Sequence, residues 1–313
     1  MSMRSVFLVW RELDPLLATL RARFPDVTFE GAATADGFPD RRVECEALLS
    51  FELRPGWLAR LPRLRWVQSI GAGVDRLVGV PGLPPAVTIT RTRADFGRQI
   101  AEHCLGALLH HCGGWPRWAG QQAARVWERG PRSLLLARRA GVLGLGGVGG
   151  EVASLLQAVG LEVWGLSAGG RPHPACARVF GAGGMEEFLS GPDFVVIALP
   201  LTAATRGLLD APRLAWLRHG SVLVNVARAD IVDETELARA LDEHRIAAAY
   251  LDVLWQEPLP ADSPWWSREN VFVTPHLAGV TETGALADEF GDNLRRYLAG
   301  EPLHQVVDRV RGY

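Results

Sequence analysis

Short apolar runs alternate with helix-like segments over the first part of the chain. The apolar runs predict strands at residues 5–10, 27–32, 45–51 and 65–73. Apolar residues at helical spacing predict a helix at 13–25 and a shorter one at 56–64. Strand and helix in turn are typical of a parallel sheet that carries helices on both faces.

The pattern then changes and restarts. A long helix is predicted at 98–113, and a polar stretch rich in Arg and Trp follows to about residue 139. Further on, a helix at 148–160 ends at Gly160, and a final helix is predicted at 282–300. Near-continuous runs of Val, Ile, Leu and Ala are typical of strands buried on both faces, and they predict strands at 140–146, 161–167, 193–200, 221–227, 246–253 and 270–275.

Length and composition agree with a globular protein of two domains. The chain has 313 residues, which is long for one compact core, with 48% hydrophobic and 22% charged residues. The formal net charge of −2 does not favour a nucleic-acid partner. The N-terminus is charged too early for a signal peptide, and no apolar run approaches the roughly 18 residues of a membrane span. We therefore expect a cytoplasmic protein with no membrane partner.

The cysteines and histidines do not favour a metal site. None of the four cysteines forms a C-x-x-C pair, so neither a zinc site nor a disulfide framework is predicted. Several of these residues crowd the helix at 98–113, namely His103, Cys104, His110, His111 and Cys112. A metal could bind there, but no further ligand is spaced to complete a site. Core packing and hinge contacts are the preferred interpretation.

A glycine motif follows the predicted strand at 140–146. Gly144-x-Gly146-x-x-Gly149 lies between that strand and the next helix. In such a loop the first glycine makes the turn, the second admits a pyrophosphate, and the third lets the helix pack closely. The motif alone is weak in a chain with 34 glycines. Because the strand, turn and helix are all predicted, the motif indicates dinucleotide binding.

Four polar residues lie at or just past the ends of later strands: Arg228, Asp252, Glu257 and His276. Ligands of doubly wound sheets bind outside the carboxyl ends of the strands, so the four side chains are expected to converge. Each also has a structural interpretation. His276 could be a buried ring, Arg228 could pair with Asp230, Glu257 could be a solvated turn residue, and Asp252 could cap a turn. A purely structural role for all four residues requires all of these interpretations to be true at once, so a shared site is favoured.

The motifs and their order resemble the D-isomer-specific 2-hydroxyacid dehydrogenase family. The matching pieces span most of the chain: SIGAGVD at 69–75, AEH at 101–103, GLGGVG at 144–149, LPLTAATRGLL at 199–209, NVARADIVDETEL at 225–237, LDVLWQEPLP at 251–260 and TPHLAG at 274–279. Residues 93–103 and the Trp- and Arg-rich segment are most similar to the glyoxylate/hydroxypyruvate reductase branch. The resemblance implies an oxidoreductase that reduces a small 2-keto acid to the D-2-hydroxy acid.

The resemblance also implies a fold. It is α/β, with two doubly wound parallel-sheet, Rossmann-like domains and a cleft between them. The substrate domain would be discontinuous, made of 1–94 and 282–313, and the dinucleotide-binding domain would span 95–281. The helix at 98–113 and the approach to the last helix would be the hinges.

Reduction of a keto acid requires a hydride, a proton donor and groups that bind and orient the carboxylate. His276 is the expected acid, and Glu257 would favour its protonated form. Arg228 offers a planar fork for the carboxylate and the carbonyl. The loop of Gly71, Ala72 and Gly73 would bind the carboxylate through the Ala72 and Gly73 amides. Asp75, next but one in the chain, is interpreted as structural.

The expected cofactor is NADP(H), with NAD(H) accepted weakly. NAD-binding domains carry an acidic residue about 20 positions past the glycines, yet no carboxylate follows Ser167 until Glu186. Arg171 would contact the 2′-phosphate, although Gly147 stands where relatives often have a basic residue. By resemblance, Asp252 would bind the nicotinamide carboxamide. The full expected cofactor set is Gly144, Gly146, Gly147, Val148, Gly149, Ser167, Arg171, Leu199, Pro200, Thr205, Val226, Ala227, Asp252, His276, Ala278 and Gly279.

Trp115, Trp118 and Trp127 lie among Arg and Gln before the glycine loop. Aromatic residues in such a setting suit a buried interface, and in the resembled family this region embraces a second subunit, so a homodimer is expected. Satellite core packing is the alternative. A nucleotide-sensing corepressor on the same fold remains the main alternative function, with phosphite or formate oxidation less favoured.

Overall fold

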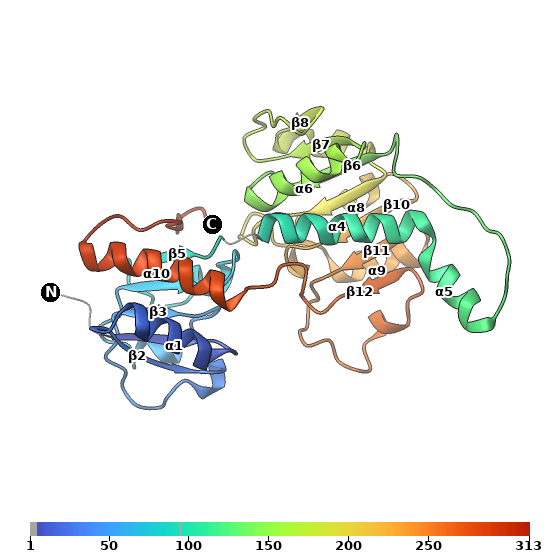
Figure 1. The fold of residues 1–313 in the computed structure, drawn as a ribbon. Coiled ribbons are helices and arrows are strands. Elements are labelled where there is room, and N and C mark those ends of the chain that lie inside the picture. The colour runs from blue at the N-terminus through green and yellow to red at the C-terminus, as the bar shows by residue number, and fades with distance from the viewer. Residues whose placement is uncertain (1–4, 94–95) are drawn as a thin grey trace. The chain divides into compact units, whose positions relative to one another are not determined.

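The computed structural model describes residues 5–93 and 96–313. The chain divides into two compact units, one made of Met1–Ala94 with Thr281–Tyr313, and the other of Asp95–Val280. The first predicted domain boundary, between residues 94 and 95, falls outside the described residues. The chain returns to the first unit between Val280 and Thr281. Figure 1 traces both units from the N-terminus to the C-terminus.

The first unit contains a five-stranded parallel sheet in the order β2-β1-β3-β4-β5. This order changes direction between β1 and β3, as in flavodoxin-like sheets. The strands are β1 (Ser5–Val9), β2 (Thr28–Ala32), β3 (Ala47–Leu49), β4 (Trp66–Ser69) and β5 (Thr88–Arg91). The strand β5 was not predicted, since it has only four residues and no continuous apolar run.

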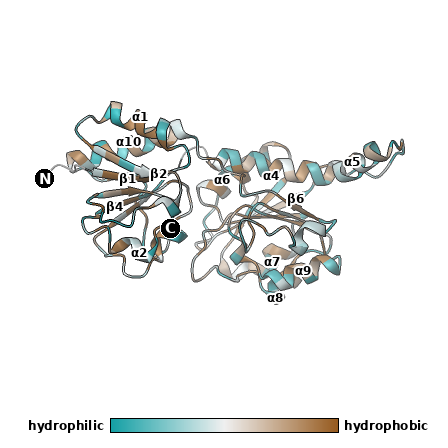
Figure 2. Ribbon diagram, turned by 90° about the horizontal axis from the view of Figure 1, so that it is seen from below, coloured by the Kyte–Doolittle hydropathy of each residue, from teal (hydrophilic) through white to brown (hydrophobic). Residues whose placement is uncertain are grey.

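Helices cover both faces of this sheet. Helices α1 (Leu13–Arg23) and α10 (Thr283–Ala299) lie on one face, and α2 (Pro55–Leu58) on the other (Figure 2). Alternate residues of β1 explain this, because Val6 and Leu8 pack in the core of α1 and α10. Phe7 and Val9 pack in the opposite core with α2 and α3 (Asp75–Val78). The period of two therefore builds two separate cores.

Two predicted elements of this unit extend well beyond the C-terminal ends of the observed ones. The helix expected over 56–64 ends at Leu58, because Pro62 has no amide to bond the Leu58 carbonyl and its ring would clash with that carbonyl in a continued helix. The strand expected over 65–73 ends at Ser69, where the side chain of Ser69 bonds the backbone of the following loop.

The second unit contains a seven-stranded parallel sheet in the order β12-β11-β10-β9-β6-β7-β8. The order reverses between β6 and β9, which makes the carboxyl ends of these strands the switch point. The strands are β6 (Arg139–Leu143), β7 (Glu162–Leu166), β8 (Arg178–Phe180), β9 (Phe194–Ile197), β10 (Ser221–Asn225), β11 (Ile246–Leu251) and β12 (Val271–Val273).

Helices again cover both faces. Helices α4 (Phe96–Gly113) and α6 (Gly147–Ala158) lie side by side over one face (Figures 1 and 2). The other face carries α7 (Met185–Ser190), α8 (Ala211–Trp216) and α9 (Glu234–Asp242). These helices bury Phe188, Leu214 and Leu237 against the strands. Single-turn helices lie at Ala35–Gly37, Ala182–Gly184, Ala229–Ile231 and Pro264–Ser267.

Helix α5 (Trp115–Ala124) and the segment after it project beyond the body of the second unit (Figure 1). Trp127 is 98% exposed, and Trp115, Leu134 and Leu136 are also exposed. The alternative of satellite core packing therefore does not hold for Trp115 and Trp127 within this chain. None of the helices in the described residues is long and apolar enough to cross a membrane.

Candidate active site

The glycine loop after β6 has the backbone geometry that its sequence predicts. Gly144 has a φ of +103°, which favours glycine. A Cβ at Gly149 would lie 1.7 Å from the carbonyl oxygen of Gly144, so no other residue fits. Gly146 and Gly147 face open space. Helix α6 starts there without a side-chain cap, so its first amides can bind an anion such as a pyrophosphate.

The loop after β9 borders this glycine loop. The Ala198 amide donates to the carbonyl of Leu143 (2.9 Å), and a Cβ at Gly144 would meet Leu199 at 3.1 Å. The Thr205 hydroxyl donates to the carbonyl of Pro200 (2.6 Å). The expected positions Leu199, Pro200 and Thr205 therefore form one ordered loop at the switch point of the sheet.

The loop after β7 carries the positions that were expected to select the cofactor. The Gly170 amide donates to the Ser167 carbonyl (3.2 Å), which makes a turn, and Arg171 is exposed on it. Sequence reasoning missed His173. Its Nε2 lies 3.1 Å from where a Cβ of Gly150 would stand, in the first turns of α6. The Nδ1 of His173 accepts from the Ala175 amide (3.3 Å).

Asp252 organises the loop that carries His276. It is 2% exposed, and its Oδ1 accepts from the Thr274 hydroxyl (2.6 Å) and the Leu277 amide (2.9 Å). Its Oδ2 accepts from the Ala278 amide (2.9 Å). The His276 amide donates to the Asp252 carbonyl (2.9 Å). These bonds hold His276 at a φ of +53°, an uncommon conformation for this residue type.

His276 and Glu257 form a pair. The Nδ1 of His276 lies 2.9 Å from Oε2 of Glu257, and Oε1 of Glu257 accepts from the Leu254 amide (3.0 Å). A carboxylate only accepts, so the proton of this bond belongs to Nδ1, and Nε2 is left for another partner. The His276 side chain is 46% exposed, so it is not a buried core ring, and Glu257 is held rather than loose in a turn.

The segment that carries Glu257 is anchored by tryptophans. Trp255 stacks on Trp265 with the ring centroids 5.2 Å apart, and Trp255 Nε1 donates to the Val232 carbonyl (3.1 Å). Trp265 is 4% exposed, and its Nε1 donates to Glu234 (2.8 Å). These contacts tie the loop after β11 to helix α9.

Arg228 follows β10, and Asn225 shapes its turn. The Asn225 side chain is 1% exposed, accepts from the Ala227 amide (3.1 Å) and donates to the Arg228 carbonyl (3.1 Å). Sequence reasoning missed Asn225, although a buried amide inside an apolar strand was its signal. The alternative partner of Arg228, Asp230, accepts from Arg206 (2.6 Å).

The ends of β10, β11 and β12 are joined by backbone hydrogen bonds. The Asp252 amide donates to the Asn225 carbonyl (3.0 Å), and the His276 amide to the Asp252 carbonyl (2.9 Å). Arg228, Asp252 and His276 therefore lie on neighbouring strand ends of one sheet. The expected positions Val226, Ala227, Ala278 and Gly279 lie on the same connections.

The expected carboxylate loop lies in the first unit, after β4. The Gly71 amide is buried and donates to the Ser69 hydroxyl (3.3 Å). Ala72 and Gly73 are half-buried, and their amides meet no acceptor within the part of the chain that the structure describes. Two such neighbouring donors at the end of a parallel strand can receive an anion.

The His and Cys cluster of α4 packs against the sheet. His110 Nδ1 lies 2.8 Å from the Tyr250 hydroxyl, and its ring meets Phe272 edge to face. Burial lowers the pKa of His110 and of His111. Across residues 5–93 and 96–313, no group of three or more His, Cys, Asp or Glu could hold a metal ion.

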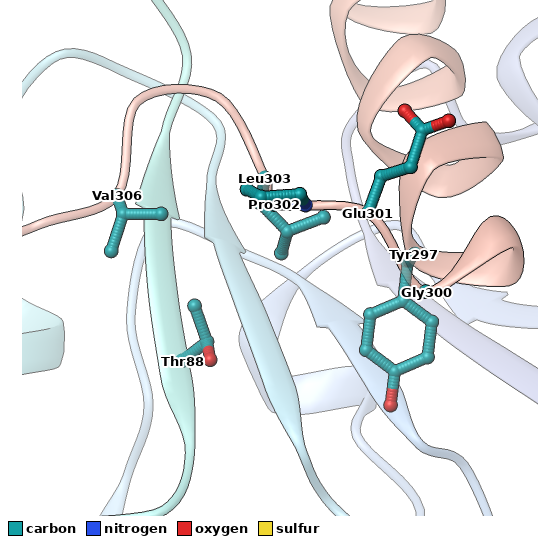
Figure 3. A pocket seen from close by; sticks show the side chains of 7 residues that line it. All are labelled: Thr88, Tyr297, Gly300, Glu301, Pro302, Leu303 and Val306. Carbon is teal, nitrogen blue, oxygen red and sulfur yellow. The ribbon is translucent and has the colours of Figure 1, made fainter.

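A cavity of about 430 Å³ lies in the first unit, beside the end of α10 (Figure 3). Its lining is Thr88, Tyr297, Gly300, Glu301, Pro302, Leu303 and Val306. The single charged residue of this lining, Glu301, would repel a keto acid. The cavity therefore does not resemble a carboxylate site, and the residues described above remain the candidates.

A Rossmann glycine loop and an ordered histidine–carboxylate pair, both past the carboxyl ends of strands in one parallel sheet, are typical of a dinucleotide-dependent oxidoreductase. Residues 105–278 match the family model of the D-isomer specific 2-hydroxyacid dehydrogenase NAD binding domain. The chain is 33% identical over 258 residues to glyoxylate/hydroxypyruvate reductase A of Klebsiella pneumoniae strain 342, a match that covers 80% of this chain and 82% of the relative. The chain belongs to the D-isomer-specific 2-hydroxyacid dehydrogenase family and is an NAD(P)-dependent oxidoreductase.

Solved structures agree with this family. A D-isomer specific 2-hydroxyacid dehydrogenase from Xanthobacter autotrophicus Py2, in complex with NADPH and MES, superposes with a TM-score of 0.88 at 36% identity over 100% of both chains. An NADPH-dependent glyoxylate/hydroxypyruvate reductase from Sinorhizobium meliloti, in complex with NADP and sulfate, gives 0.89 at 28% identity, covering 99% of this chain and 100% of that one. The predicted fold class of two parallel-sheet α/β units is confirmed.

Proposed function

We propose that this protein reduces small 2-keto acids of the glyoxylate and hydroxypyruvate type to D-2-hydroxy acids. The observation that carries the proposal is the His276–Glu257 pair, 2.9 Å apart, past strand ends that neighbour the one followed by Arg228. The name of the Klebsiella relative supports the same substrate class.

The residues divide the chemistry between them. Arg228 binds the keto acid through its planar guanidinium fork and polarises the carbonyl. The Ala72 and Gly73 amides hold the carboxylate. Nε2 of His276 donates the proton to the carbonyl oxygen, while Glu257 orients the ring through Nδ1. In the reverse direction Nε2 takes the proton from the hydroxyl.

The residues of the glycine loop and its neighbours fit a dinucleotide, which supplies the hydride when bound. Gly146, Gly147, Val148 and Gly149 offer the start of α6 to its pyrophosphate. The positions proposed to lie along the bound dinucleotide are Leu199, Pro200, Thr205, Val226, Ala227, Ala278 and Gly279. Asp252 first holds the His276 loop; its Oδ2 accepts from the Ala278 amide and keeps a lone pair for the carboxamide.

NADP(H) is the proposed cofactor, with NAD(H) accepted weakly. No carboxylate lies between Ser167 and Glu186 to accept the ribose hydroxyls or to repel a 2′-phosphate. Ser167 and Arg171 lie on the loop after β7, where a 2′-phosphate would bind. The Xanthobacter and Sinorhizobium proteins described above bind NADPH and NADP, which supports the same choice.

We further propose a homodimer in the cytoplasm, with residues 1–94 and 282–313 as the substrate domain and 95–281 as the cofactor domain. The exposed Trp115, Trp127, Leu134 and Leu136 support an interface, because one segment of 22 residues leaves these four large apolar side chains open to solvent. A monomer mass in light scattering would contradict the dimer.

The test is turnover. The protein is mixed with NADPH or NADH and a panel of 2-keto acids that includes glyoxylate and hydroxypyruvate, and cofactor absorbance is followed. Oxidation of NADPH with these two substrates is expected. Dinucleotide binding without turnover of any panel member would instead favour the corepressor function, and turnover of phosphite or formate the third alternative.

A further inference from the structure

The loop proposed to bind the substrate carboxylate is shaped by one buried hydroxyl. Ser69 is fully buried at the end of β4. Its Oγ donates to the Gly73 carbonyl (2.9 Å) and accepts from the Gly71 amide (3.3 Å). A single side chain therefore bonds the backbone on both sides of Ala72.

Two consequences follow for the amides of Ala72 and Gly73. The hydroxyl of Ser69 turns the Gly73 carbonyl toward a buried atom, and the Thr281 hydroxyl bonds the Ile70 carbonyl (3.3 Å). Carbonyl oxygens that would repel a carboxylate are thus satisfied inside the unit. The two amides stay half-buried and have no acceptor among the described residues.

The backbone of Ser69 is itself fixed by hydrogen bonds to its carbonyl. The Thr92 hydroxyl and the Thr92 amide both donate to the Ser69 carbonyl, at 2.7 and 3.1 Å. The Thr92 hydroxyl accepts from Gln68 Nε2 (3.3 Å). Oε1 of Gln68 accepts from the Thr90 hydroxyl (3.2 Å) and from Asn293 Nδ2 (3.0 Å). All these side chains are between 0% and 3% exposed.

A buried polar network of this kind is costly to bury unless each group is bonded, and it then fixes one arrangement. One end of it, at Asn293, bonds the His304 carbonyl and amide and so ties down the C-terminal segment. The other end is Ser69 and the loop. Only the end at Ser69 contacts the loop that is proposed to bind the substrate carboxylate.

We propose that Ser69 is a positioning residue for the substrate carboxylate, because its hydroxyl holds the Ala72 and Gly73 amides in the arrangement that receives it. This rests on the proposed function of the loop. Removal of the hydroxyl does not remove the two amides, but it lets the loop adopt other conformations. The substrate must then order the loop again on binding.

The test compares Ser69→Ala with Thr90→Val. Each removes two side-chain hydrogen bonds from the same network, but the Thr90 hydroxyl bonds Trp66 Nε1 and Gln68 and none of the loop. For Ser69→Ala we expect KM for glyoxylate to rise about tenfold with kcat within about twofold, because the lost interaction is made equally in ground and transition states. KM for NADPH should not move.

For Thr90→Val we expect an unfolding midpoint at least as low as that of Ser69→Ala, with KM for glyoxylate unchanged. Equal KM changes in the two variants would mean that the network acts on stability alone, and would overturn the proposal. If Ser69→Ala fails to fold, Thr92→Val, which removes one of the two hydrogen bonds to the Ser69 carbonyl, should raise KM by a smaller factor. An unchanged KM there would also overturn the proposal.

Calorimetry with oxamate, a carboxylate of keto-acid shape, separates this proposal from the proposed function. Wild type loaded with NADPH should bind oxamate, and Ser69→Ala should bind it about tenfold more weakly. If wild type turns over no keto acid, yet Ser69→Ala binds oxamate more weakly than wild type does, the proposed reaction fails and the role of Ser69 stands. If Ser69→Ala binds oxamate as tightly as wild type, or if wild type does not bind it, the role of Ser69 fails.

Discussion

The two glycine-bearing loops of this protein, after β6 and after β4, are built in different ways. In the loop of 144–149 the backbone itself requires glycine, since Gly144 has a positive φ and a Cβ at Gly149 would lie 1.7 Å from a carbonyl oxygen. In the loop of 71–73 a Cβ at Gly71 would meet only the edge of the Phe51 ring, at 2.8 Å. There the shape comes from the Ser69 hydroxyl.

The sequence reveals these two kinds of loop to different extents. A loop fixed by backbone sterics leaves a spacing of glycines that can be recognised directly. A loop fixed by a buried side chain leaves only a serine, and its function depends on partners in β5 and α10 that are distant in the sequence. Under the proposed function the same two loops have different roles: the second unit would carry the reacting groups, and the loop of the first unit would bind the substrate carboxylate.

The largest effect should come from a reacting group of the second unit. His276→Ala should lower the chemical rate about 10²–10⁴-fold, the usual contribution of a general acid, with NADPH affinity nearly intact. Single-turnover kinetics measures the step, and His219→Ala, an exposed histidine of the same unit, is the control. Retention of most of the rate would make His276 structural.

Glu257→Gln refines this result. The amide can no longer act as a charged acceptor for the Nδ1 proton, so the ring is held less firmly and kcat for reduction should fall, with KM for NADPH unchanged. Steady-state kinetics with glyoxylate is the measurement. An unchanged kcat would contradict a role for the 2.9 Å pair in orienting the acid.

Arg228→Lys should come next, with kcat/KM lowered by about 10²-fold and KM raised, since lysine keeps the charge but not the bidentate fork. Steady-state kinetics with glyoxylate measures both constants. A nearly silent variant would mean that Arg228 supplies charge alone.

The comparison of the loops is tested directly by adding one methyl group to each. Gly149→Ala should destabilise the second unit by about 3 kcal/mol or more, at the upper end of overpacking effects, because the clash is with backbone. Gly71→Ala should cost less than about 1 kcal/mol, because the half-exposed Phe51 ring can move aside. Thermal unfolding checks both, and equal losses would break the comparison.

Arg171→Ala should reduce the preference for NADPH over NADH about tenfold, the worth of one charge-assisted hydrogen bond. The ratio of kcat/KM for the two cofactors is measured in wild type, in this variant and in Arg213→Ala, whose guanidinium pairs with Asp210. A wild type that prefers NADH, or an unchanged ratio, would contradict the proposed cofactor choice.

The smallest expected effect concerns the His cluster of α4. Burial lowers the pKa of His111, with Arg138 and His110 as further causes, so the folded state keeps the ring neutral where the unfolded chain takes up a proton. Stability is therefore lost as the pH falls through the ordinary pKa of the ring. His111→Gln should show a shallower decline of the unfolding temperature than wild type between about pH 7.5 and 5. An equally steep decline would contradict burial of His111 as its cause.

Much of the second unit could be predicted from the sequence, because its apolar runs are long and its glycine motif is dictated by sterics. The family motifs also predicted His276, Glu257 and Arg228 as site residues; the structure places them on neighbouring strand ends, and their catalytic roles stay predictions. The sequence did not reveal β5 or α5, which are short or polar. Nor did it reveal Ser69, Asn225 or His173, whose contacts depend on the fold bringing polar atoms to a particular backbone turn.

Chiral analysis of the product is the decisive measurement for the proposed reaction. Purified protein is incubated with hydroxypyruvate and NADPH, and the glycerate formed is resolved by chiral chromatography against D and L standards. We expect D-glycerate in one-to-one proportion to the NADPH oxidised. L-glycerate, a racemate, or NADPH left unoxidised would contradict the proposed reaction.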